Sequence, residues 1–209
     1  MYPAPSVAEF KEALDSFLPQ LEIYNYTADE ISGMVNLYEP MKEWARNMHA
    51  AGVKNLVTMA PVEELLDDGS GTGQSVVDLW TILPIQYDNE IEMVQKALAK
   101  GDEVWSYNTL VQDDYSPKWD IDFTSMDFRL QSGFISHSLD LTGLLYWRVD
   151  LWTVDPWNEV APDRADILSP GDGMMMYPGK QVGTKGAVAS MRMKWLREGV
   201  EDYEYAQIL

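Results

Sequence analysis

Ile23-Tyr24-Asn25-Tyr26-Thr27-Ala28-Asp29-Glu30 is a run of aromatic and β-branched residues that leads directly into two adjacent carboxylates. Such residues fit a pleated, half-buried strand. An unpaired charge inside a buried strand is costly, so we expect Asp29 and Glu30 at the carboxyl-terminal tip of the strand, before a loop opened by Ser32-Gly33. In a (β/α) barrel the active site lies at that end of the strands.

The presence of two neighbouring acids carries no information by itself in this chain. With 34 acidic residues among 209, roughly five or six adjacent acid pairs are expected from composition alone. The sequence holds six such pairs: Asp29-Glu30, Glu63-Glu64, Asp67-Asp68, Asp102-Glu103, Asp113-Asp114 and Glu201-Asp202. Only the position of Asp29-Glu30, at the end of an apolar strand, sets it apart.

The charge balance argues against several classes of partner and site. Fifteen basic residues face 34 acidic ones, a net charge of −19, and both nucleic acid and anionic membrane surfaces require positive charge. With no cysteine and only His49 and His137, there is little from which to build a zinc site or a Ser-His-Asp triad, so we expect no metal and no cofactor. There is no run of 18 apolar residues, and so no membrane-spanning helix is expected. The N-terminus has neither the basic start nor the apolar core of a signal peptide, and the sequence leaves open whether a parent chain is exported.

Strand and helix patterns alternate five times along the chain, which is typical of parallel strands joined by helical crossovers. The predicted strands cover residues 23–30, 53–59, 76–83, 104–109 and 142–149, and the predicted helices cover about 7–18, 36–52, 88–101, 123–138 and 187–209. Polar or Pro- and Gly-rich loops are expected at 112–120 and 151–186. His49 lies near the end of its helix, where we expect it to be solvated or favoured by the helix dipole. The fold class is α/β, with residues 1–209 as a single domain.

Aromatic side chains gather where the predicted strands end, among them Trp105, Tyr107, Trp147 and Trp152. Strand side chains alternate between faces, so Trp105 and Tyr107 share one. These rings could belong to the core of the sheet. As a set that meets two carboxylates, they favour a carbohydrate cleft.

Several stretches together resemble the catalytic domain of glycoside hydrolase family 123, the β-N-acetylgalactosaminidases. In order along the chain, they are Tyr26-Thr27-Ala28-Asp29-Glu30, Val104-Trp105-Ser106-Tyr107, Thr142-Gly143-Leu144-Leu145-Tyr146-Trp147, Gly171-Asp172-Gly173, Tyr177-Pro178-Gly179, Ser190-Met191-Arg192 and Leu196-Arg197-Glu198-Gly199-Val200-Glu201-Asp202-Tyr203-Glu204-Tyr205. The resemblance implies a (β/α) TIM-type barrel and a glycan substrate that contains N-acetylhexosamine.

Two departures from the family pattern stand out. The family usually has proline after its Asp-Glu pair, and this chain has Ile31. The family barrel has eight strands, whereas about five are predicted here, and a full barrel needs about 250 residues. The chain therefore resembles the second half of the barrel. A half barrel leaves strand edges unpaired, so we expect it to need the missing N-terminal half or to associate with itself.

The resemblance implies a retaining mechanism assisted by the 2-acetamido group of the substrate. Asp29 would orient that group and Glu30 would act as acid and base. The expected substrate-binding residues are Tyr26, Trp105, Tyr107, Trp147, Asp150 and Trp152, and Tyr107 could donate to the acetamido oxygen. Arg192, Arg197, Glu198, Glu201 and Asp202 are expected to form an ion-pair network that holds the last helix. Two alternatives stay open: an inactive, truncated carbohydrate-binding or scaffold relative, and a glycosidase of different sugar specificity.

Overall fold

The computed structural model describes residues 2–108, 119, 124–152, 155–158 and 171–209. The chain divides into two compact units, Met1–Trp105 and Ser106–Leu209, and each is described by itself. The predicted loop at 112–120 lies outside the described residues except for Trp119, which is buried.

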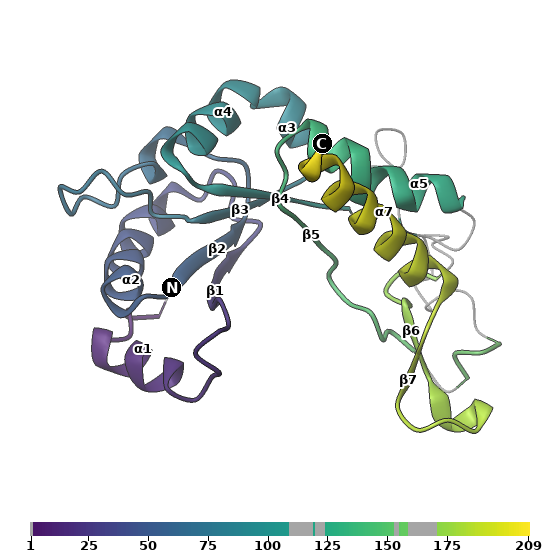
Figure 1. Cartoon of the computed structure of the whole chain (residues 1–209). Helices are drawn as coiled ribbons and strands as arrows, with labels where there is room; N and C mark the ends of the chain where they lie inside the picture. Colours follow the sequence, from purple (N-terminus) through teal and green to yellow (C-terminus); the bar gives the residue numbers. More distant parts are fainter. Residues whose placement is uncertain (1, 109–118, 120–123, 153–154, 159–170) are drawn as a thin grey trace. The chain divides into compact units, whose positions relative to one another are not determined.

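The strands form one sheet in the order β1-β2-β3-β4-β5, with helices interleaved along the chain (Figure 1). The strands are β1 (Tyr24–Asp29), β2 (Lys54–Thr58), β3 (Leu79–Ile82), β4 (Glu103–Tyr107) and β5 (Gly143–Leu145). The sheet is parallel, and β1 forms one of its edges. This confirms the predicted α/β class with five parallel strands, an arrangement consistent with part of a TIM barrel.

The helices of the first unit pack through regularly spaced apolar side chains. They are α1 (Val7–Leu14), η1 (Val35–Leu37), α2 (Tyr38–Ala51), η2 (Glu63–Leu65), α3 (Pro84–Asn89) and α4 (Ile91–Lys100). In α2, Met41, Ala45 and Met48 are fully buried, at the spacing that places side chains on one helical face. The predicted end of α2 is confirmed, because Gly52 caps it with φ 85°, a conformation that favours glycine.

The second unit is built on a pair of helical segments. One runs through α5 (Ser125–Leu130), a π-helical turn η4 (Gln131–Ile135) and α6 (Ser136–Ser138), and α7 (Met191–Ile208) packs along it (Figure 1). Their core contains Trp119, Phe128 and Met175.

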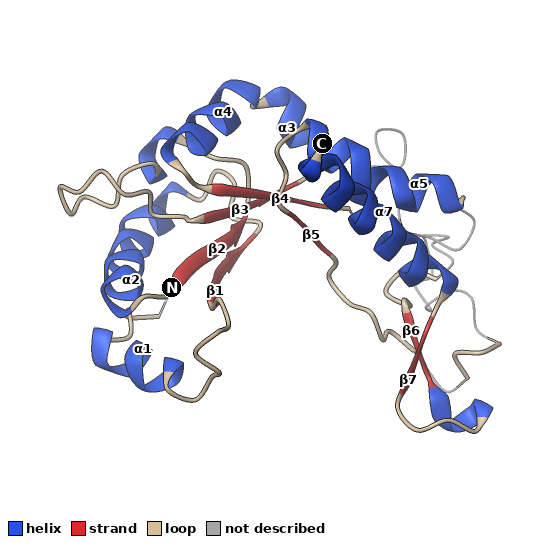
Figure 2. Ribbon diagram, viewed as in Figure 1, coloured by secondary structure: helices blue, strands red, loops and turns tan. Residues whose placement is uncertain are grey.

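The sequence-based predictions were wrong about part of the loop 151–186 and about the start of the helix 187–209, because α7 begins only at Met191. Two short strands, β6 (Met176–Pro178) and β7 (Ala187–Ala189), pair as an antiparallel hairpin around η5 (Gly179–Val182) (Figure 2). A three-residue strand is too short to show alternation, and Pro178 argues against a strand. The predicted strand 142–149 is also shorter, since β5 ends at Leu145.

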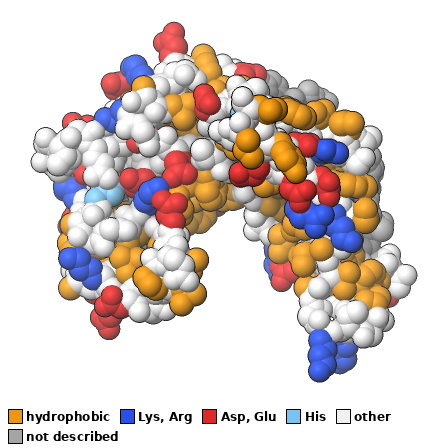
Figure 3. Space-filling model, viewed as in Figure 1, with side chains coloured by type: hydrophobic (Ala, Val, Ile, Leu, Met, Phe, Trp, Pro, Cys, Tyr) orange, Lys and Arg blue, Asp and Glu red, His pale blue; other side chains and the backbone are white. Residues whose placement is uncertain are grey.

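Carboxylates are spread over the face shown in Figure 3 rather than gathered into one patch. The net charge of −19 favours solubility. In the part of the chain that the structure describes, no helix has both the length and the apolar character needed to span a membrane.

Candidate active site

Asp29 is the last residue of β1, and Glu30 directly follows the strand, as predicted. Both side chains are exposed. Glu30 has φ 48°, in the left-handed region. This conformation costs a residue with a Cβ atom about 1–2 kcal/mol, and such strain is concentrated at functional sites. Consecutive strand residues face opposite sides of a sheet, and the left-handed turn at Glu30 ends that alternation.

A β-bulge precedes the two acids. Tyr26 is aligned with Leu56 of β2, but Ala28 is aligned with Val57, so Thr27 is an extra residue on β1. In a regular strand Tyr26 and Asp29, three residues apart, would face opposite sides. The extra residue brings them to the same side, and the Tyr26 hydroxyl donates a hydrogen bond to Asp29 Oδ1 at 2.5 Å.

A buried hydroxyl on the neighbouring strand contacts both acids. Thr58, the register partner of Asp29, is 2% exposed. Its Oγ1 donates to Asp29 Oδ1 at 2.7 Å and accepts the backbone N–H of Glu30 at 2.8 Å. It also lies 2.9 Å from the hydroxyl oxygen of Tyr26. Sequence reasoning missed Thr58, because only the strand register reveals that it stands beside the pair.

The environment of Tyr26 keeps its hydroxyl protonated. Burial, followed by the hydrogen bond to Asp29, raises the pKa of Tyr26 to about 12. The hydroxyl therefore remains a donor to Asp29 at any physiological pH. The side chain as a whole is still 51% exposed, so Tyr26 combines a fixed hydroxyl with an accessible ring.

Aromatic and ionic contacts extend along the same face of the sheet toward the start of β1. Trp105 packs on Tyr24 with ring centroids 5.8 Å apart. Lys54 forms ion pairs with Glu22 and with Glu103, the latter at 2.8 Å, and the Tyr24 hydroxyl donates to Glu103 at 2.9 Å. Of the predicted substrate-binding residues, the structure thus brings Tyr26 into contact with Asp29 and places Trp105 on Tyr24.

The first unit contains a hollow of about 430 Å³, and the lining of this hollow includes Ser32 and Gly33, which follow the two acids in the chain. It is formed by segments that follow β1, β2 and β3, the carboxyl ends at which α/β sheets bind ligands. The lining of the hollow is partly polar and partly apolar. Its polar residues include Ser32, Glu64, Gln86 and Asn89, and its apolar residues include Pro61 and Met93.

In the second unit, a buried carboxylate holds two aromatic side chains. Asp172 is 5% exposed, and its Oδ1 accepts the Tyr146 hydroxyl at 2.9 Å and the indole N–H of Trp147 at 3.0 Å. Trp147 itself remains 46% exposed. The Gly171-Asp172-Gly173 motif therefore holds Trp147 by its polar edge while part of its side chain stays accessible.

The glycines on either side of Asp172 leave room for large neighbours. Both have φ above 70°. A Cβ atom on Gly173 would lie 3.0 Å from the Trp147 ring, and one on Gly171 would lie 2.9 Å from the Arg192 guanidinium. Side chains at these two positions would displace the residues that pack there. Asp172 and its glycines were recognised in the sequence only as a family motif, without a role.

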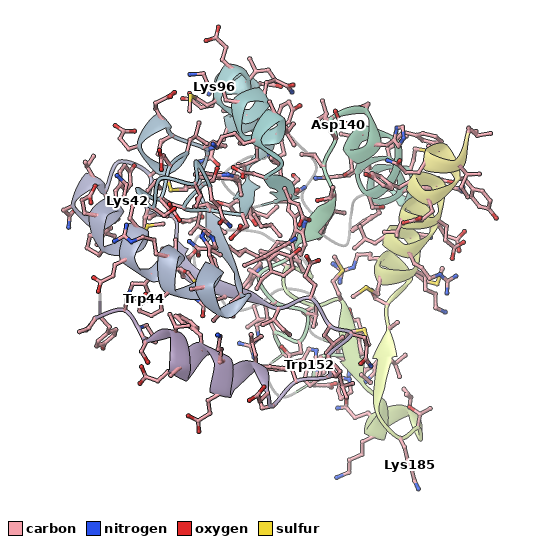
Figure 4. All side chains as sticks on the ribbon, turned by 60° about the vertical axis from the view of Figure 1, so that its left-hand side comes forward. Lys42, Trp44, Lys96, Asp140, Trp152 and Lys185 are labelled. Atoms are coloured by element: carbon pink, nitrogen blue, oxygen red, sulfur yellow. The ribbon has the colours of Figure 1, made fainter. Side chains whose placement is uncertain are left out.

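The remaining predicted substrate-binding residues have separate environments. Trp152 donates its indole N–H to the Met176 carbonyl at 2.7 Å and lies by β6 (Figure 4). Asp150 pairs with Arg148 at 2.9 Å. Tyr107 is buried at the end of β4.

The prediction that His49 is solvated was wrong, although His49 does lie in the last turn of α2, as predicted. The side chain is only 10% exposed, and its Nδ1 and Nε2 lie 3.4 Å from Asp68 and 3.0 Å from Asp78. A prediction based on the helix terminus alone cannot anticipate two acids from the segment before β3. Within the described ranges, no group of three or more potential ligands could hold a metal ion.

The predicted ion-pair network on the last helix is present in part. Asp202 pairs with Arg129 of α5, with one contact at 2.7 Å, whereas Arg197 pairs with Glu198 and Glu201 of its own helix. Arg192 is buried and donates to the carbonyls of Trp119, Gly171 and Met174. Among the described residues, the anchor of Arg192 is therefore a set of backbone carbonyls.

Comparison with known families supports the expected relationship. The family model described as "Glycoside hydrolase 123, catalytic domain" matches residues 3–209, nearly the whole chain. No curated protein matches this chain.

Proposed function

The chain belongs to the glycoside hydrolase 123 catalytic-domain family, and from this premise we propose that it is a retaining β-N-acetylgalactosaminidase-like enzyme. The proposed nucleophile is the 2-acetamido group of the substrate, assisted by Asp29 and Glu30. The observation that carries the proposal is the pair at the tip of β1, with one acid held by two hydroxyls and the other in a left-handed turn.

Asp29 has the arrangement that an orienting carboxylate needs. Its Oδ1 accepts hydrogen bonds from Tyr26 and Thr58, which fix the plane of the carboxylate and leave Oδ2 to accept the acetamido N–H. The acetamido carbonyl oxygen then attacks the anomeric carbon. As the bond to the leaving group breaks, positive charge develops on the acetamido group, and ionised Asp29 stabilises it.

Glu30 is assigned the proton transfers. It gives its proton to the glycosidic oxygen as the bond from C1 to that oxygen breaks. In the second half of the reaction, its carboxylate takes a proton from water while the water oxygen bonds to C1 and the acetamido oxygen leaves. The sugar then has its original anomeric configuration, and Glu30 has regained its proton.

The predicted substrate-binding residues remain proposed contacts of the sugar. Trp147 suits this role best, because Asp172 holds its indole N–H while the side chain remains accessible. Tyr107, Trp105, Trp152 and Asp150 are retained as candidate contacts. The hollow at Ser32, Glu64 and Asn89 would receive the part of the glycan beyond the cleaved bond.

We also retain the proposal that a partner completes the barrel. β1 is an edge strand, and an edge offers unpaired backbone groups to a further strand. Either further barrel strands or a second copy of this chain would meet that requirement. Sedimentation of the active species distinguishes these two cases.

The test of the proposed function is release of p-nitrophenol from its β-N-acetylgalactosaminide and its β-galactoside. We expect turnover of the first substrate alone, because the second lacks the acetamido nucleophile. Glu30→Gln should abolish hydrolysis of substrates with poor leaving groups, and NMR of the first-formed sugar should show a retained anomer. Turnover of the plain galactoside at a similar rate would refute acetamido participation and support a different sugar specificity.

The second candidate function is carbohydrate binding without hydrolysis. It is favoured by the open edge at β1 and by the accessible Trp147. In that case the folded wild-type chain would bind N-acetylgalactosamine without turnover, and Trp147→Ala would remove binding whereas Glu30→Gln would not.

A further inference from the structure

We propose that Thr58 is a positioning residue for both carboxylates and that Tyr26 positions Asp29 alone. The kinetic consequences rest on the proposed function, but the structural consequence can be measured without it.

The hydrogen bonds around the two acids form two sets, here called arms. Both arms include Thr58 Oγ1. The first arm ends on Asp29 Oδ1, which receives the hydroxyls of Thr58 at 2.7 Å and Tyr26 at 2.5 Å. The second arm ends on Glu30, whose backbone N–H donates to Thr58 Oγ1 at 2.8 Å. Tyr26 therefore donates directly to the first arm and meets the second only through its 2.9 Å contact with Thr58 Oγ1, whereas Thr58 bonds directly in both.

The chemistry of a hydroxyl suits this double role. A threonine hydroxyl has one hydrogen to donate and lone pairs that accept, so it can bond a carboxylate and an amide at the same time. Thr58 is 2% exposed, so water is excluded as a ready substitute. Its place opposite Asp29 in the register of β1 and β2 fixes the oxygen relative to both residues.

The two arms have different consequences for the reaction. The Asp29 arm keeps Oδ1 occupied and aims the carboxylate at the acetamido group. This arm therefore controls the position of the nucleophile. The Glu30 arm holds the backbone of the left-handed residue and so controls where the general acid stands. Loss of the Glu30 arm should matter more as the leaving group becomes poorer, because poor leaving groups depend on protonation.

The kinetic test uses Thr58→Val, Thr58→Ser and Tyr26→Phe with aryl β-N-acetylgalactosaminides whose phenols differ in acidity. For Thr58→Val we expect kcat to fall about tenfold with p-nitrophenol and about a hundredfold with unsubstituted phenol as leaving group. For Tyr26→Phe we expect a fall of about tenfold for both. Thr58→Ser keeps the hydroxyl and should stay within about threefold of wild type.

The structural test is hydrogen exchange of the Glu30 amide, followed by NMR on the full chain. The exchange rate should rise at least tenfold in Thr58→Val and remain unchanged in Tyr26→Phe and Thr58→Ser. If Thr58→Val does not fold, Thr58→Ala replaces it in both measurements. An inactive wild-type chain with this exchange pattern would remove the proposed function and leave the positioning role intact.

Three results would overturn the inference. The first is an unchanged Glu30 exchange rate in Thr58→Val. The second is an equal loss of rate for good and poor leaving groups in that variant. The third is a Thr58→Ser variant as impaired as Thr58→Val, since a retained hydroxyl would then not be sufficient to position the two acids.

Discussion

Tyr26 and Asp29 are three positions apart on β1, yet the Tyr26 hydroxyl donates to the Asp29 carboxylate at 2.5 Å. The bulge at Thr27 makes this contact possible. Thr27 itself is held by polar contacts, because its hydroxyl donates to the buried amide oxygen of Asn55 and accepts from Asn25 Nδ2 at 2.8 Å. The geometry of the acids thus depends on a side chain that points away from them.

We predict that Thr27→Val lowers both stability and activity. The substitution leaves the Asn55 oxygen, in a side chain with no exposed surface, without its donor, which costs about 1–3 kcal/mol. It also loosens the bulge that aligns Tyr26 with Asp29. Urea unfolding measures the first effect, and hydrolysis of the aryl N-acetylgalactosaminide well below the unfolding transition measures the second.

Thr27→Ser is the matched control, because it keeps the hydroxyl and should retain wild-type activity. If Thr27→Val is less stable but fully active, the bulge does not depend on the Thr27 hydroxyl.

The sequence was sufficient to place Asp29 and Glu30 at the end of the first strand, because strand composition and an abrupt change to acids are local signals. It could not predict the partners of the pair. Alternation puts Tyr26 and Asp29 on opposite faces, and only pairing with β2 reveals both the bulge and the position of Thr58.

Contacts between distant segments were likewise beyond sequence reasoning. The His49 side chain meets Asp68 and Asp78, 19 and 29 positions later, and no periodicity encodes such a meeting. The β6–β7 hairpin was missed for another reason: three-residue strands carry too little pattern. The helix ends at Gly52 and Gly101, by contrast, were predicted because a left-handed cap depends on one residue.

Arg192→Lys should destabilise the second unit. The Arg192 guanidinium donates to three backbone carbonyls, one in the Gly171-Asp172-Gly173 motif and one on the residue that follows it. A lysine carries the same charge on a single nitrogen and cannot reproduce the planar fork. We expect a loss of about 2–3 kcal/mol in the unfolding free energy, measured by urea denaturation.

Arg197→Lys provides the comparison, because its ion pairs are exposed and lie within α7. Exposed pairs contribute about 0–1 kcal/mol, so this variant should unfold close to wild type. Equal losses in the two variants would contradict a special role for the buried guanidinium.

Gly199→Ala should be destabilising although alanine favours helices. In an open helix this change gains about 1 kcal/mol. In α7, however, the added Cβ would lie 1.9 Å from Ser132 Oγ and 2.4 Å from the Arg129 carbonyl, so the two helical segments must separate. Overpacking costs about 1–3 kcal/mol, and thermal unfolding should show a lower Tm.

An exposed position on α7 provides the control for the effect of alanine on the helix itself. Glu204→Ala adds an alanine at an exposed position of the same helix, and its Tm should stay near that of wild type. A Gly199→Ala protein with a raised Tm would mean that α7 and η4 pack less tightly than the structure shows.

The unfolding free energy of the first unit should decrease as pH rises from about 5 to 8. Burial acts to lower the pKa of His49, but hydrogen bonds and charge from Asp78 and Asp68 outweigh it and raise that pKa above its ordinary value of 6.5. Stabilisation by protonated His49 is therefore complete below pH 6.5 and is lost as pH rises through the higher folded-state pKa.

Asp102 also makes the unfolding free energy decrease as pH rises. Burial is the main cause that raises the pKa of Asp102 from 3.8 to about 6, and the charge of Asp78 adds to it, against the hydrogen bond from the Trp80 indole N–H at 3.1 Å. A raised carboxyl pKa means that the folded state binds the proton more tightly than the unfolded state. This contribution is complete below about pH 3.8 and is lost as pH rises through about 6.

Urea unfolding at pH 5, 6, 7 and 8 separates the two groups. Asp102→Asn should remove the decrease in stability that lies below about pH 6, and His49→Gln should remove the decrease above 6.5. His137→Gln, which removes the other histidine, should keep the wild-type profile, since no ion pair involves it among the described residues. A wild-type profile that is flat between pH 5 and 8, or unchanged in both single variants, would show that the acids around His49 do not govern the stability of this unit.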